Sequence, residues 1–170
     1  MKRVTLTTLV LLLLVAPLVA GSLALSLGTW NLPPSSGVVS EGSFVQVGGV
    51  WAFAPRWEVE LFLISEATPN IGGQLLGGTA LTLALLSPHN PPPEEAPLYL
   101  NLYLSLGFLG KFESASPAYG PFIRLSPLAV GGPRFKVRER SLNLSLFYNI
   151  PRNSVTIFWN LFLVDLFFKK

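Results

Sequence analysis

The sequence predicts an all-β protein: an antiparallel, up-and-down transmembrane β-barrel of eight strands behind an N-terminal signal peptide. Three observations predict it. Apolar residues recur at every second position over much of the chain, half of the residues are hydrophobic while only 12% are charged, and no segment after residue 20 is an unbroken apolar run of 18. Alternation at period two indicates a strand with one apolar face, whereas a membrane-spanning helix needs a long continuous apolar run.

Residues 1–20 have the features of a secretory signal peptide. Lys2 and Arg3 form a short basic start, residues 5–20 are uncharged and apolar, and small or apolar residues precede the expected cleavage after Ala20. An uncleaved anchor helix is the alternative, but the apolar run is shorter than the roughly 20 residues that a span needs. We therefore expect one β-barrel domain over residues 21–170.

The clearest strand runs from Leu98 to Phe108. Its even-numbered positions are all leucine or phenylalanine, and its odd-numbered positions are Tyr, Asn, Ser or Gly. Because a strand points successive side chains to opposite faces, this segment has one apolar face and one face of small, polar or aromatic residues.

Similar alternation, punctuated by Pro, Gly and Asn clusters, predicts eight strands in total. They lie near 22–30, 43–53, 56–64, 74–87, 97–109, 118–129, 135–148 and 154–168. Most have the length of about 9–11 residues that a tilted membrane strand requires. The last segment is apolar on both faces, so its register is ambiguous.

Charge and cysteine content exclude several classes of function. The formal charge is +3, and removal of Lys2 and Arg3 leaves 10 basic and 9 acidic residues. A nearly neutral mature chain carries no nucleic-acid footprint. The chain has no cysteine, which excludes disulfides and thiolate metal sites.

The composition of the second face favours a membrane barrel over a soluble one. A sheet facing water normally carries many charged residues, but here that face is mostly Gly, Ser, Ala, Asn and Tyr. This distribution suits a leucine-rich band against lipid around a tightly filled interior. Closure is expected because lipid offers no partner to the backbone groups of an open sheet edge. A soluble, lipocalin-like barrel that binds a lipid inside is the alternative.

The leader, the eight alternating segments and the aromatic-rich last strand resemble the small eight-stranded bacterial outer-membrane barrels typified by the OmpA and OmpX transmembrane domains. The resemblance covers the mature chain and is one of pattern. It implies a Gram-negative outer-membrane location, both termini in the periplasm, and outward-facing loops at 31–42, 65–73, 110–117 and 149–153. It also implies recognition of the last strand by the barrel-assembly machinery, although Lys169 and Lys170 follow Phe168.

Two sets of charged residues are candidate functional groups. Arg56, Glu58, Glu60 and Arg124 are assigned to the interior face. Because an unpaired charge in a small barrel is costly, we expect an ion-pair cluster that joins the two glutamates to Arg124 and Arg56. The second set, with the alternation of the leucines at 142–146, is expected at the membrane interface, where it would bind anionic headgroups. Its members are Arg134, Lys136, Arg138 and Arg140. A bulge near Arg140 would reverse the alternation and turn this set away.

Aromatic residues near the predicted strand ends are expected to anchor the barrel at the membrane interfaces. They are Trp30, Trp57, Tyr119 and Tyr148.

No motif predicts enzymatic chemistry. His89 is the only histidine, and no local nucleophile or orienting group accompanies it. We expect no catalytic residues, no metal and no cofactor. The expected protein is a monomer in contact with outer-membrane lipids, with a structural or surface-interaction role. The alternatives are a narrow porin-like pore or transporter for small molecules and the soluble lipid-binding barrel.

Overall fold

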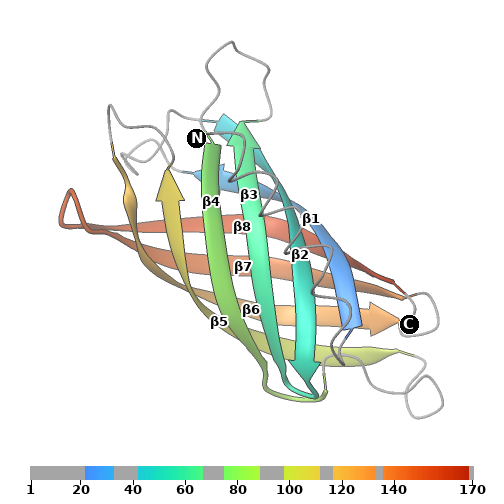
Figure 1. Ribbon diagram of the computed structural model, residues 1–170. Coiled ribbons are helices and arrows are strands. Elements are labelled where there is room, and N and C mark those ends of the chain that lie inside the picture. Colours follow the sequence, from blue (N-terminus) through green and yellow to red (C-terminus); the bar gives the residue numbers. More distant parts are fainter. Residues whose placement is uncertain are drawn as a thin grey trace.

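The computed structural model describes residues 22–32, 42–66, 75–88, 98–111, 117–132 and 136–168. These residues form a closed antiparallel barrel in which each strand pairs with its neighbours in the chain and β8 pairs with β1 (Figure 1). The strands are β1 (Ser22–Leu32), β2 (Gly42–Ala54), β3 (Trp57–Glu66), β4 (Leu75–Ala84), β5 (Tyr99–Lys111), β6 (Tyr119–Gly132), β7 (Val137–Asn149) and β8 (Ser154–Phe167). The predicted eight-stranded up-and-down barrel is confirmed. The predicted leader, residues 1–20, lies outside the described residues.

The described residues include no helix with the length and apolarity needed to cross a membrane.

The two ends of the barrel differ in their connections. The terminal end, where β1 begins and β8 finishes, carries the connections 55–56, 85–98 and 133–136. The opposite end carries the connections 33–41, 67–74, 112–118 and 150–153. Pro55 and Arg56 make the shortest link, and the 85–98 link is the long exception at the terminal end.

Side chains alternate between the inside and the outside of the barrel as the leucine pattern predicts. Leu106 and Leu144 are 54% and 47% exposed, whereas Tyr103 and Phe147 are 0% exposed. The outward residues of every strand are mainly Leu, Val, Ile and aromatic residues, and the inward residues are small, polar, charged or aromatic. The leucine face therefore points away from the barrel axis.

The alternation reverses once in each of the strands β6, β7 and β8. At 127–128, 141–142 and 161–162, two successive residues lie outside the buried set, and the buried positions then change from even to odd numbers. The three sites are neighbours, since Leu128 pairs with Ser141 and Ser141 pairs with Phe162. Leu142 has a φ of 55°, in the left-handed region.

Register shifts at the two borders of this three-strand block accommodate the change. One lies between β5 and β6 near Asn101 and Tyr103, and the other lies between β1 and β8 near Gly28 and Asn31. A bulge adds one residue to one side of a strand pair and so inverts the faces beyond it. In this barrel the extra residue runs through three adjacent strands, so the ladders inside the block keep a constant register.

The half of the interior near the opposite end is apolar. Phe62, Phe122, Phe147 and Phe158 are buried there among Ile64, Leu76, Ala80, Leu109 and Ala118. The Phe62 and Phe122 rings meet edge to face with centroids 6.0 Å apart. Space for Phe62 depends on Gly78 on the next strand, because an added Cβ there would lie 2.4 Å from the ring carbon Cζ.

Candidate functional site: a charged network inside the barrel

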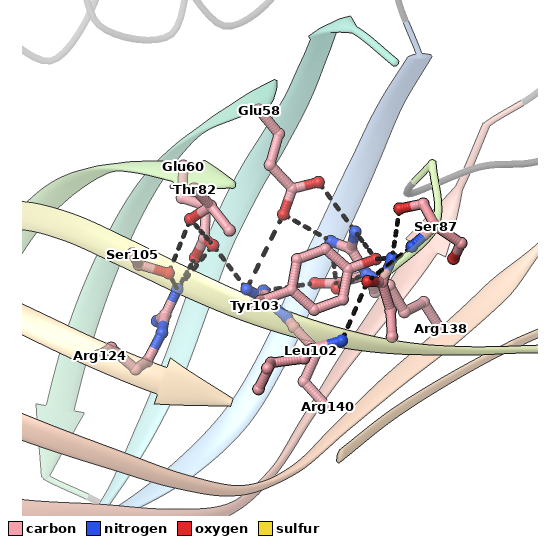
Figure 2. A network of polar contacts seen from close by, with 12 residues as sticks. Glu58, Glu60, Thr82, Ser87, Leu102, Tyr103, Ser105, Arg124, Arg138 and Arg140 are labelled. Carbon is pink, nitrogen blue, oxygen red and sulfur yellow. Dashed lines mark hydrogen bonds and ion pairs between the residues drawn. The ribbon is translucent and has the colours of Figure 1, made fainter. Parts of the chain in front are cut away.

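The half of the interior near the terminal end holds an ion-paired network (Figure 2). Three arginines and three acidic residues lie in it, each at most 1% exposed: Arg124, Arg138, Arg140, Glu58, Glu60 and Asp165. Their formal charges balance when all six are ionised. Such balance is required because a buried charge without a partner is strongly unfavourable.

Glu60 is the meeting point of two arginines. Arg124 Nη2 lies 2.6 Å from both carboxylate oxygens, and Arg140 Nη1 donates to Oε1 at 2.5 Å. The Thr82 hydroxyl donates to the same Oε1 at 2.8 Å, and Arg124 Nη2 also reaches Ser105 Oγ at 3.1 Å. Strands β3, β4, β5, β6 and β7 are thereby connected through one carboxylate and its neighbours.

Arg138 is the second centre of the network. Its Nη1 and Nη2 donate to Glu58 at 2.8 and 3.0 Å, and its Nε donates to Asp165 Oδ2 at 2.7 Å. The guanidinium carbon lies 4.8 Å from the Tyr103 ring centroid and 5.3 Å from the Phe167 ring centroid. Two carboxylates and two aromatic faces therefore fix its position, an arrangement to which the planar guanidinium is suited.

The arginine–glutamate pairs cross the barrel. Strands β3 and β7 are four positions apart in a ring of eight, so they lie on opposite walls. Arg138 with Glu58, and Arg140 with Glu60, connect these walls directly. Asp165 on β8 binds both arginines, with Arg140 Nη2 at 3.1 Å from its Oδ1. The side chains thus fill the cross-section that the strands enclose.

The structure brings together three of the four residues expected in the interior cluster. Glu58, Glu60 and Arg124 are inside the barrel, and Glu60 pairs with Arg124. The expectation for Arg56 is wrong, because this residue is exposed in the β2–β3 turn and donates to the carbonyl of Leu85 at 2.8 Å. A register shift between Ala52 and Ala54, followed by the turn, takes it out of the strand pattern.

The prediction that four basic residues bind lipid headgroups at the membrane interface is wrong for two of them. Arg138 and Arg140 are 0% exposed and belong to the interior network. The reversal at 141–142 is the physical reason, because it places these arginines on the face opposite to that of Leu144. Lys136 lies in the turn before β7 with partial exposure, and Arg134 lies outside the described residues.

The predicted interface aromatics lie on the outer surface where the side chains are described. Trp57 at the terminal end is 39% exposed, and Tyr119 and Tyr148 at the opposite end are 42% and 39% exposed. The Tyr148 hydroxyl donates to Asn153 at 2.7 Å. Trp30 is in β1, but its side chain is outside the described set.

Sequence reasoning missed Asp165 and Tyr103 as parts of the network. Asp165 was detectable, since it is the only charged residue between Val155 and Phe168 and such a residue in an apolar strand needs an interior partner. Tyr103 was assigned to the interior face of its strand, but nothing local distinguishes it from the neighbouring polar residues.

The chemistry of this site is ion pairing between side chains that satisfy one another. Among the described residues, no group of three or more His, Cys, Asp or Glu side chains is arranged to hold a metal ion.

The fold and the interior network together define a class of protein: a closed eight-stranded antiparallel barrel with an apolar outer face and an ion-paired interior. Comparisons with protein-family models, curated proteins and solved structures found no match. The structure therefore supports a small closed eight-stranded barrel, and no comparison relates this chain to the OmpA or OmpX domains.

Proposed function

We propose that this protein spans the bacterial outer membrane as a sealed β-barrel and serves there as a non-enzymatic structural or surface-interaction protein. The observation that carries the proposal is the inverted distribution of polarity. Leucines and aromatic residues cover the outside, and the charged residues named above lie inside. A soluble monomer rarely exposes contiguous apolar area beyond a few hundred Å², whereas a membrane barrel requires an apolar outer band.

The position of the charges on the outer face supports the same proposal. Among the described side chains of the strands, Glu139 and Lys111 are the charged ones that are not buried, and both lie near strand ends. Strands of 10 to 14 residues are long enough to cross the hydrocarbon when tilted. The middle of the outer face can then meet lipid without burying a charge.

The filled interior supports a sealed barrel. The crossing ion pairs occupy the terminal half, and four phenylalanines occupy the other half. A barrel of about eight strands has an interior that side chains alone can fill. In a planar bilayer we expect no steady single-channel conductance, and a reproducible conductance would favour the pore alternative.

Fractionation tests the location directly. We expect the mature chain to stay with outer membranes after a carbonate wash and to migrate faster on gels before heating than after it. The lipocalin-like alternative predicts a protein that remains dispersed in detergent-free buffer and carries a lipid-like ligand.

A matched pair of substitutions tests which surface meets lipid. Leu106 and Leu98 are both exposed, at 54% and 66%, but Leu106 is in the middle of β5 and Leu98 directly precedes it. The two positions are eight residues apart, which corresponds to roughly 26 Å along the strand. We expect Leu106→Arg to destabilise the barrel in lipid by about 2–4 kcal/mol and Leu98→Arg by about 0–1 kcal/mol.

The measurement is reversible unfolding in lipid vesicles. A water-facing surface would tolerate both changes equally, since surface substitutions usually alter stability by no more than about 0.5 kcal/mol. Equal and small effects at Leu106 and Leu98 would therefore contradict the membrane proposal.

A further inference from the structure

Several buried polar atoms on one wall of the interior have no protein partner. Within the described part of the chain, these atoms include Nε and Nη1 of Arg124, Oγ of Ser145, and both the amide nitrogen and the amide oxygen of Asn160. Each of the three side chains is at most 1% exposed. Buried polar groups in proteins are nearly always hydrogen-bonded, so these atoms require partners of another kind.

The three residues form one connected patch across β6, β7 and β8. Arg124 pairs with Ser145 between β6 and β7, and Asn160 on β8 pairs with Asn143, two residues from Ser145. Side chains that are directly opposite or diagonal across neighbouring strands lie about 5–8 Å apart. Arg140 joins the patch, because its Nε also has no partner and its guanidinium meets that of Arg124 at Glu60.

We propose that this patch holds a small cluster of ordered water molecules. The arginine nitrogens need hydrogen-bond acceptors, and the Asn160 oxygen needs a donor. The Ser145 hydroxyl can pair with a donor or with an acceptor. Water is the simplest ligand that both donates and accepts, and a buried water typically makes about three hydrogen bonds to groups of this kind. An anion could not donate to the Asn160 oxygen and would disturb the charge balance of the network.

The surroundings make the hydrated patch a closed one toward the opposite end of the barrel. On each of the three strands, the next inward residue in that direction is a phenylalanine that is at most 2% exposed. These residues are Phe122 beside Arg124, Phe147 beside Ser145 and Phe158 beside Asn160. Their rings border the patch with apolar surface, while the ion pairs border it toward the terminal end. Exchange with bulk solvent should therefore be slow. This inference does not depend on whether lipid or water surrounds the barrel.

The test is water-selective NMR on the purified full chain, with Asn101 as an internal control. Asn101 is also 1% exposed, but its amide nitrogen donates to the Ser87 carbonyl at 2.8 Å and to Tyr103 at 3.2 Å. We expect cross-relaxation from long-lived water to the Asn160 side-chain amide and to Arg124 Nε–H. We expect none at the Asn101 amide.

Other results would overturn the inference. They are an Asn160 amide and an Arg124 Nε–H that both lack water cross-peaks, or an Arg124 Nε shift that titrates with chloride concentration. Asn160→Leu adds a second readout, because it should weaken the water cross-peak at Arg124 Nε–H. An unchanged cross-peak in that variant would remove Asn160 from the site.

Discussion

The two halves of the barrel interior fill the same enclosed space in different ways. Near the opposite end, phenylalanine rings and aliphatic side chains pack against one another. Near the terminal end, three arginines and three acidic residues pair across the barrel. The walls of both halves are built from the same strands, so the contrast lies in the side chains alone.

The two solutions differ in what they demand of each residue. Apolar packing depends on volume, so a substitution of similar size usually costs less than about 1.5 kcal/mol. A buried ion pair depends on having every partner in place, because its attraction barely offsets the loss of hydration. We therefore expect the charged half to fix which strands face each other and the apolar half to be the more tolerant of substitution.

The largest effect is expected on removing a charge from the network. Glu60→Gln keeps the shape of the side chain but leaves Arg124 and Arg140 without their shared counter-ion. We expect a loss of about 3–5 kcal/mol in the free energy of unfolding, measured by denaturant titration of the refolded barrel.

Glu139→Gln is the matched control. Glu139 is exposed on the outer side of β7 and contacts the Ser141 hydroxyl at 2.9 Å. Its neutralisation should change stability by no more than about 0.5 kcal/mol. A similar loss for Glu60→Gln and Glu139→Gln would show that the interior ion pairs do not depend on one another.

Local alternation was sufficient to predict the strands and the faces of most of them. In β5, one period-two pattern runs from Tyr99 to Leu109, and the predicted faces agree with the observed burial. The same reasoning placed Glu58, Glu60 and Arg124 in the barrel interior, since the alternation in their strands is unbroken up to those positions.

The same reasoning failed where the alternation reverses. Arg138 and Arg140 follow the alternation of the leucines beyond them, but two successive outward residues at 141–142 separate the two patterns. The reversal is set by pairing with β6 and β8, which is a property of the sheet and not of the segment. Adjacent apolar residues at 161–162 are the trace that it leaves in the sequence, and they explain the ambiguity of the last strand.

An intermediate effect is expected on adding one methyl group to the apolar half. Gly78→Ala would place Cβ 2.4 Å from Cζ of Phe62 and 3.1 Å from the Phe108 carbonyl oxygen. We expect a loss of about 1–3 kcal/mol from overpacking, measured by the same unfolding titration. Phe62→Leu in the same chain should recover part of it, because the smaller side chain vacates the space. An additive loss in the double variant would show that the ring is not what the methyl group meets.

The smallest effect is expected at Asn160, for which Asn101 in the same interior is the matched comparison. Asn101 exchanges hydrogen bonds with the backbone of Leu86 and Ser87 and with Tyr103, whereas Asn160 has no described protein partner for its side-chain amide. Substitution of asparagine by leucine changes the side-chain volume by the same amount at both positions. Asn101→Leu leaves buried donors and acceptors without hydrogen-bond partners. We expect it to lower the free energy of unfolding by about 1–3 kcal/mol.

Asn160→Leu should lose about 1 kcal/mol or less, because only water-mediated bonds are given up and apolar surface is buried in exchange. The difference between the two variants, measured by unfolding in the same lipid or detergent, separates polar groups that the fold itself satisfies from groups that solvent satisfies. Equal losses would mean that Asn160 is held by protein contacts as firmly as Asn101. The polar groups of the charged half would then all be hydrogen-bonded to other protein groups, and no water would lie between this half and the phenylalanines of the apolar half.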